Sequence, residues 1–475
     1  MELDIEPKEI WKHFEEICKI PHCSKHEEKL GEYIINIAKE KGLEVQKDEI
    51  GNVVVRKKAS PGYEHVPTVI LQGHIDMVCE KNKDVEHDFE KDPIPVYQDG
   101  EYLKAKGTTL GADNGVGVAI ALAIMEKDIV SGNLEFLFTV DEETGLTGAS
   151  HLKPDFIKGR MLLNLDSEEF GSIYIGCAGG GNSTIRLPLT FIPSNENGLQ
   201  IMVKGLRGGH SGTDIDKGRA NAIKLLARIL WNIDGYKLSS IEGGDKHNAI
   251  PREASAVILP SDEEKVRKVA KDIEALLREE FSSTEPNLAI EIKNIEVRRL
   301  LSDESQQKVL HLLMALPHGV LAMSQDVKGL VETSTNLATV RTNDALEILM
   351  SSRSSVKSSL QFIMQVIRAI GEMAGAEVKE GDLYPGWKPN LNSRLLHIAS
   401  ETYKELFGKE PEKKAIHAGL ETGIIGEKIG NMDMISIGPQ IEYPHSPDER
   451  VHIPSVQKFY TYLLKILENI AKEKY

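Results

Sequence analysis

The spacing of apolar and polar positions divides the chain into regions of different character. Four apolar runs in its first part are bounded by polar turns, at residues 53–56, 68–72, 134–140 and 161–165. Continuous apolar runs of this length are typical of interior strands in a sheet that is covered on both faces. Residues 115–127 (GVGVAIALAIMEK) are apolar on almost every side and predict a helix that is largely buried. Strands that alternate with helices predict an α/β fold with a mixed sheet.

The N-terminal segment predicts two helices. Residues 5–19 carry apolar side chains at helical spacing, and Pro21 ends that helix. Ser24 is followed three residues later by Glu27, which is the pattern of a capping box. We therefore expect a second helix that begins after Ser24 and runs to about Lys41.

The pattern changes after Cys177. The glycine cluster at residues 178–182 (AGGGN) predicts a hinge or a tight turn, and it does not match the GxGxxG spacing of a dinucleotide site. From about residue 186 to residue 384, strand patterns alternate with long helices that have one polar face, which predicts an α+β domain. Residues 384–392 contain two prolines and are expected to form a linker, after which helix and strand patterns resume.

The composition of the chain excludes some classes of binding partner but adds little about the fold. The 475 residues include 57 basic and 73 acidic side chains, a formal net charge of −16. Nucleic acids and anionic membranes require a basic face, so neither partner is expected. No uninterrupted apolar stretch of about 18 residues occurs, and the N-terminus lacks the pattern of a signal peptide. The four cysteines form no CxxC pair and are too few for a disulfide scaffold, which indicates the reducing cytoplasm.

Histidine and acidic residues follow the predicted strands at the point where each strand ends. They are His74 and Asp76 after residues 68–72, Glu142 and Glu143 after residues 134–140, Asp166 after residues 161–165, and His445 beyond a strand at residues 432–437. Because ligands of open α/β sheets bind outside the carboxyl ends of the strands, we expect these groups to converge on one edge. Asp113, at the glycine-flanked start of the apolar helix, could reach the same edge.

Imidazole and carboxylate ligands without a thiolate suit zinc, manganese or cobalt. Two histidines and three carboxylates exceed what one tetrahedral ion needs, and two ions roughly 3.5–4 Å apart would use them all. The neighbours Glu142 and Glu143 can then differ in role, one as a ligand and the other as a base. The alternative interpretations are a solvated acidic loop for this pair, and turn or capping roles for each residue taken singly.

The motifs that carry these residues match a known family. GHIDMV, GADNG, DEETG, NLDSEE and PHSPDERV resemble the metal-site motifs of the cocatalytic zinc aminoacylase/carboxypeptidase-type metallopeptidases. More narrowly, the chain resembles the Xaa-His (aminoacyl-histidine) or cytosol non-specific dipeptidases. This likeness extends over the whole length and includes IPHCSKHEE, GLRGGHSGTDI, HNAIPRE, SSRSSV and HAGLETG.

The resemblance implies a role for each residue of the predicted metal site. His74 and Asp166 would hold one metal ion, and Glu143 and His445 would hold the other. Asp113 would bridge both ions and would be followed by a cis peptide bond.

Further roles follow from the same resemblance. Asp76 would orient His74 through a hydrogen bond, and Glu142 would be the general base and acid. In the inserted domain, His210 would stabilise the oxyanion. The substrate's free carboxylate would be bound by Asn248, Arg353 and the backbone around Gly419. The alternatives are that His210 caps the helix that follows it and that Arg353 is a surface arginine.

The positions of these residues also predict the domain organisation. The metal-type residues cluster before residue 170 and again near residue 445, so both ends of the chain should fold together. We expect residues 1–185 and 386–475 to form a discontinuous catalytic, metal-binding domain. Residues 186–385 would be an inserted α+β lid or dimerisation domain, and a homodimer is one expected assembly.

The expected function is that of a metal-dependent dipeptidase of the cytoplasm. It would hydrolyse dipeptides, Xaa-His among them, with two divalent metal ions per chain, zinc in the first place and cobalt or manganese as alternatives. A tripeptidase or an N-acyl amino acid deacylase would use the same site. A non-catalytic protein that only binds metal or dipeptide is less consistent with the sequence, because the expected base, Glu142, is present.

Overall fold

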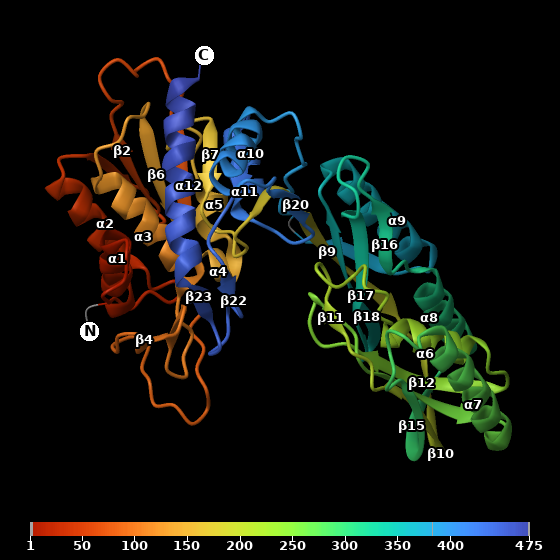
Figure 1. The fold of residues 1–475 in the computed structure, drawn as a ribbon. Helices are drawn as coiled ribbons and strands as arrows, with labels where there is room; N and C mark the ends of the chain where they lie inside the picture. Colours follow the sequence, from red (N-terminus) through yellow and green to blue (C-terminus); the bar gives the residue numbers. More distant parts are fainter. Residues whose placement is uncertain (1–2, 382, 474–475) are drawn as a thin grey trace. The chain divides into compact units, whose positions relative to one another are not determined.

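The computed structural model of the chain describes residues 3–381 and 383–473 (Figure 1). The chain forms two compact units. Unit 1 comprises the chain up to Gly176, Pro389–Ala415 and the chain from Leu420 onward. Unit 2 comprises Cys177–Lys388 and Ile416–Gly419. Within the described residues, no helix combines the length and the apolar character that crossing a membrane requires.

A mixed sheet forms the framework of unit 1, which confirms the predicted α/β fold. Its strand order is β1 (Glu44–Lys47), β2 (Val53–Lys57), β6 (Leu134–Thr139), β3 (Val69–His74), β7 (Met161–Asn164), β21 (Asp433–Ser436), β8 (Ser172–Cys177) and β20 (Glu412–Ile416). The central strands β6, β3, β7 and β21 run parallel, whereas β1, β2 and β8 are antiparallel to their neighbours. The side chains of β3, β6 and β7 are buried on both faces, which explains why their sequences are continuous apolar runs.

The helices of unit 1 cover this sheet. They are α1 (Lys8–Lys19), α2 (Glu28–Glu40), α3 (Ala112–Glu126), α10 (Arg394–Phe407), α11 (Glu421–Ile429) and α12 (Ile453–Lys472), with the short α4 (Glu142–Gly145) and α5 (Thr147–His151) after β6. The apolar helix α3 packs against β3 and α1 and also contacts α12 (Figure 1). It is buried at every position from Ala112 to Met125, as its sequence predicts. A small antiparallel sheet joins β4 (Val96–Asp99), β5 (Tyr102–Ala105), β23 (Arg450–His452) and β22 (Ile441–Glu442).

The predicted capping box at Ser24 is wrong. Helix α2 begins at Glu28, and the structure shows no side-chain cap at its N-terminus. The hydroxyl of Ser24 instead donates a hydrogen bond of 2.7 Å to Asp76, which lies 52 residues away in the sequence. A tertiary contact has replaced the local one that the sequence pattern indicates.

Unit 2 is built on an antiparallel sheet with helices on it (Figure 1). The strand order is β15 (Ala289–Leu301), β10 (Phe191–Lys204), β14 (Ala254–Pro260), β12 (Tyr236–Gly243), β17 (Val331–Thr342), β18 (Ala345–Ser354), β9 (Gly179–Pro188) and β19 (Glu377–Glu380), and β16 (Gly319–Met323) pairs with β17. Alternate residues of β9 and β14 are buried. They form one apolar core with the helices α6 (Ala222–Trp231), α7 (Glu263–Glu280), α8 (Asp303–Ala315) and α9 (Lys357–Met373). The short strands β11 (Gly209–His210) and β13 (Ala249–Ile250) pair separately.

The glycine cluster lies in strand β9, so the predicted tight turn is wrong. The cluster stands at the start of unit 2, and the expected hinge stays a prediction. Gly180 pairs with Tyr384, and Cys177 pairs with Trp387. A side chain on Gly180 would place its Cβ atom 2.3 Å from the hydroxyl oxygen of Tyr384. The glycines therefore allow close approach of a second segment, and the first part of the predicted linker is paired rather than extended freely.

The structure joins Cys23 and Cys79 by a disulfide bond, contrary to the reduced cysteines expected from their small number. The two residues are 56 positions apart, and their Cα atoms lie 5.7 Å from each other. The pairing depends on the parallel bridge between Cys23 and Met77, which brings the segment before α2 beside the segment that follows β3. Sequence spacing alone contains no sign of that contact.

Candidate metal centre

The carboxyl ends of the parallel strands carry most of the candidate site. His74 is the last residue of β3, and Asp166 follows β7 by two positions. Glu142 and Glu143 open α4, which begins three positions after the last residue of β6. Asp113 lies in the first turn of α3. The edge of the sheet that the sequence predicts is therefore the edge at which these side chains lie.

Asp113 is the centre of two groups of potential ligands. Its Oδ1 atom lies 3.1 Å from Nε2 of His74, and this Nε2 also lies 3.2 Å from Asp166. Its Oδ2 atom lies 3.0 Å from Nε2 of His445, and this second Nε2 lies 3.0 Å from Glu143. Each oxygen of one carboxylate thus faces its own histidine and its own acidic partner. The five residues are brought together in the pairs that the family resemblance implies.

The residues present fit a pair of divalent cations. Nitrogen and oxygen donors without sulfur suit zinc, manganese or cobalt. Two triads, His74–Asp113–Asp166 and Asp113–Glu143–His445, each offer ligand atoms close enough to bind one ion. One oxygen of Glu143 is buried and accepts no hydrogen bond from the described residues. Buried carboxylate oxygens without donors are costly, and a cation would satisfy them.

The pKa values of the residues in this cluster also indicate that it attracts positive charge. Hydrogen bonds to Asp113 and Glu143 raise the pKa of His445 to about 11. The pKa of His74 is also raised well above its usual value, because the attraction of Asp166 and the hydrogen bond to Asp113 outweigh burial. Burial raises the pKa of Asp166 to about 6. Protons and metal ions therefore compete for the same positions, and acid would favour the protons.

Asp76 holds His74 and the backbone of Glu142 and Glu143 in place through hydrogen bonds. Its carbonyl oxygen lies 3.0 Å from Nδ1 of His74, and its carboxylate lies 3.3 Å from the same nitrogen. An N–H at Nδ1 leaves the Nε2 lone pair of a neutral His74 directed at the cluster. The carboxylate also accepts the backbone N–H groups of Glu142 at 2.9 Å and Glu143 at 3.1 Å. Burial alone would raise the pKa of Asp76, but the hydrogen bonds from His74 outweigh it and bring the pKa to about 2.

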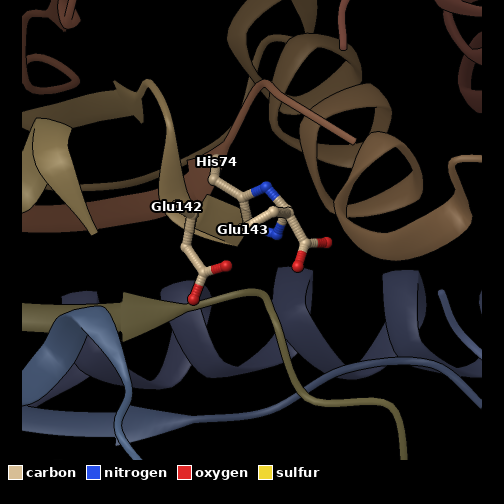
Figure 2. Close-up of side chains that lie close together, drawn as sticks. All are labelled: His74, Glu142 and Glu143. Atoms are coloured by element: carbon tan, nitrogen blue, oxygen red, sulfur yellow. The ribbon is translucent and has the colours of Figure 1, made fainter. Parts of the chain in front are cut away.

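Glu142 differs from its neighbour. Figure 2 shows Glu142, Glu143 and His74 gathered together, and their ligand atoms lie within 4.8 Å of one another. Glu143 contacts His445, whereas the carboxylate of Glu142 accepts no hydrogen bond from any residue in the described part of the chain. Burial, together with the charges of Asp166 and Glu143, raises the pKa of Glu142 well above its usual value. A half-buried carboxyl with a raised pKa and no fixed partner can accept and release a proton.

Two acidic residues beside this cluster are absent from the sequence-based set. Glu421, at the start of α11, accepts hydrogen bonds from Gln72 at 2.6 Å and Thr139 at 2.7 Å, and burial raises its pKa to about 7. Burial also raises the pKa of Glu168 to about 8, with the charges of Asp113 and Asp166 adding to it. Both residues lie in motifs that carry the family resemblance, Glu421 in HAGLETG and Glu168 in NLDSEE. Their place in these motifs is the feature of the sequence that could have identified them.

Unit 2 holds the residues expected to bind substrate. Nδ1 of His210 accepts the backbone N–H groups of Gly212 and Thr213, each at 3.2 Å. The alternative that His210 caps the helix that follows it is wrong, because residues 211–218 form a turn and the next helix, α6, is capped by Asn221. Because Nδ1 is an acceptor, the proton of the neutral ring is on Nε2, which makes Nε2 a donor. Asn248 is half-buried, and its carbonyl oxygen accepts the N–H of Ser211 at 2.8 Å.

Arg353 is not a surface arginine, so that alternative is wrong. Only 7% of it is exposed, its Nη1 donates to the hydroxyl of Tyr384 at 2.8 Å, and its buried Nε has no acceptor among the described residues. His417 is a further buried residue of this cluster, missed by the sequence reading, and its Nε2 lies 2.7 Å from the hydroxyl of Ser334. Burial and then the charge of Arg353 lower its pKa to about 4. Gly419 ends the short segment Ile416–Gly419 that contains His417.

The chain is similar to known proteins over nearly its whole length. The model of peptidase family M20/M25/M40 matches residues 70–469. The chain is 44% identical to the cytosol non-specific dipeptidase of Escherichia coli over 98% of both sequences. It is 42% identical to the aminoacylhistidine dipeptidase of Vibrio alginolyticus, whose structure covers 98% of each chain with a TM-score of 0.91. An aminopeptidase of Bacillus cereus, at 17% identity and a TM-score of 0.58 over 98% of this chain and 99% of that one, shares the fold. The resemblance indicated by the sequence motifs is confirmed, and the chain belongs to peptidase family M20/M25/M40.

Proposed function

We propose that the protein is a metal-dependent dipeptidase that hydrolyses dipeptides, Xaa-His among them, in the cytoplasm. The family membership and the relatives named above support hydrolysis of dipeptides. The observation that carries the proposal is the geometry around Asp113, which faces a histidine and a second carboxylate through each of its two oxygens, with Glu142 unpaired beside them. We propose two divalent ions per chain, with zinc as the first candidate and cobalt or manganese as alternatives.

The metal ligands in this proposal are His74 and Asp166 for one ion, Glu143 and His445 for the other, and Asp113 for both. When bound, the two cations would lower the pKa of a water molecule and polarise the scissile carbonyl group. Glu142 takes the proton of the attacking water and delivers it to the leaving amine.

The residues of unit 2 that are proposed to bind substrate would stabilise two negative charges, one on the oxyanion and one on the substrate's free carboxylate. The Nε2–H group of His210 donates to the oxyanion that forms on the carbonyl oxygen. Arg353 and Asn248, together with the backbone at Gly419, bind the substrate's free carboxylate. Binding of that carboxylate fixes the register of the peptide and restricts the enzyme to short substrates.

A substrate panel tests this proposal. Chelated protein is supplied with zinc, cobalt or manganese, and its turnover of dipeptides, including Xaa-His, is compared with that of tripeptides and N-acetyl amino acids. We expect metal-dependent cleavage with dipeptides well ahead of the other two classes. Faster cleavage of tripeptides or of N-acetyl amino acids would contradict the dipeptidase assignment in favour of one of the alternatives. Sedimentation of the same preparation tests whether the chain forms the expected homodimer.

A further inference from the structure

The loop that carries Asp113 is held by a single distant side chain. The carboxylate of Glu449 accepts four successive backbone N–H groups. Oε2 accepts those of Leu110 at 2.7 Å and Gly111 at 2.9 Å. Oε1 accepts those of Ala112 at 2.8 Å and Asp113 at 3.2 Å. These groups lie at the N-terminus of α3, where backbone N–H groups have no partner within the helix.

The geometry differs from that of an ordinary helix cap. A cap is a short polar side chain next to the helix that accepts one or two N–H groups. Glu449 lies more than 330 residues away in the sequence and is only 2% exposed. Gly111 adopts a left-handed conformation, with φ at 71°. A left-handed glycine bends the chain sharply, and the four successive N–H groups around it meet one carboxylate.

Glu449 also connects two parts of the candidate metal centre. It follows His445 by four residues, and its own N–H donates to the carbonyl oxygen of Ser446 at 3.0 Å. The same turn therefore supplies His445 to one oxygen of Asp113 and a carboxylate to the backbone N–H of Asp113. Burying a carboxylate beside Asp113 is electrostatically unfavourable, so the four hydrogen bonds are what makes this position tenable.

We propose that Glu449 is a positioning residue of the metal centre, which fixes the backbone of Asp113 so that its two carboxylate oxygens face their separate ligand groups. The inference rests on the proposed function only in requiring that the cluster binds metal. A displacement of the Leu110–Asp113 backbone would move the one ligand that both ions share. Loss of Glu449 should therefore weaken metal binding even though this residue does not itself face either ion.

The variant Glu449→Gln tests the proposal. An amide keeps the shape but replaces one acceptor oxygen by an NH₂ group that opposes two of the N–H donors. We expect metal affinity, measured by chelator competition without substrate, to fall about 10–100-fold. At saturating metal, kcat should recover towards the wild-type value with KM unchanged, which a general loss of structure would not produce. The matched control is Glu442→Gln, because Glu442 lies on the same segment but pairs with Arg450; its metal affinity should equal that of the wild type.

A second measurement needs no variant. In the metal-free wild-type chain, hydrogen exchange of the amides from Leu110 to Asp113 should be as slow as that of the α3 interior, because each is bonded to a buried carboxylate. Rapid exchange of these amides, or wild-type metal affinity in Glu449→Gln, would overturn the proposal. Metal binding is measured in the absence of substrate, so it does not depend on catalysis. A chain that binds two ions but cleaves no dipeptide would contradict the proposed function and leave the role of Glu449 intact.

Discussion

The metal cluster of unit 1 and the polar cluster of unit 2 use histidine in opposite ways. In unit 1, contacts with Asp113 and Glu143 raise the pKa of His445 to about 11. In unit 2, burial and then the charge of Arg353 lower the pKa of His210, and they lower that of His417 to about 4. The first cluster holds an excess of carboxylates, and the second holds neutral imidazoles beside a guanidinium group.

This difference indicates what each cluster complements. A site crowded with carboxylates has a negative potential and is stabilised by cations. A site of N–H donors around a buried arginine, with Nε of Arg353 lacking an acceptor among the described residues, is stabilised by an anion such as a carboxylate. A dipeptidase needs both functions, one for the chemistry and the other for recognition. Substitutions in unit 1 should therefore affect catalysis and metal binding, and substitutions in unit 2 should affect substrate-dependent steps alone.

The largest expected effect is that of Glu142→Gln. Because this side chain is the proposed proton carrier and contacts no other group as a fixed partner, its loss should reduce kcat by about 10²–10⁴-fold. Metal content should be unchanged, since the five proposed ligands remain. Steady-state kinetics with elemental analysis of the same sample measures both. Glu169→Gln is the control, because Glu169 pairs with Lys414 and Tyr174 instead of the cluster. Wild-type turnover in Glu142→Gln would disprove the base assignment.

A smaller effect is expected from His210→Ala in unit 2. Removal of one donor to an oxyanion typically reduces kcat by about 10²–10³-fold. Metal affinity should stay at the wild-type value, in contrast to substitutions in the cluster of unit 1. Kinetics and chelator competition on the same protein separate the two. The exposed His311 on α8 supplies the control variant His311→Ala. A fall in metal affinity with His210→Ala would remove the distinction between the clusters.

The smallest effect concerns stability against acid. The pKa of His417 is about 4 in the folded chain, below its ordinary value of 6.5. As the pH falls, the unfolded chain binds this proton first, so stability is lost from about pH 6.5 down to about pH 4. Between about pH 6.5 and 5.5 the loss from this one group should be about 1 kcal/mol. Calorimetry of the full chain at both values measures it, and His417→Asn should reduce the difference by that amount. An equal loss in the variant would show that His417 does not remain neutral when buried.

The sequence predicts the strand ends of unit 1 well because each ligand is local to one strand. His74 and Asp166 needed only an apolar run and the residue after it. Ser24 shows the limit, because its local pattern is that of a cap whereas its hydroxyl contacts Asp76. The Cys23–Cys79 disulfide and the four hydrogen bonds to Glu449 likewise depend on contacts between distant segments. Neither hydrophobic periodicity nor motif spacing predicts contacts between such distant segments. In the sequence, Glu449 is distinguished only by its place in the motif PHSPDERV.

The central claim is that the cluster of unit 1 binds two metal ions that share Asp113 and that both are needed for hydrolysis. The most direct test is to titrate chelated wild-type protein with zinc while measuring bound metal and dipeptide turnover together. We expect two tightly bound ions per chain, with turnover reaching its maximum only as the second ion binds. Full turnover with one ion, or with none, would contradict it.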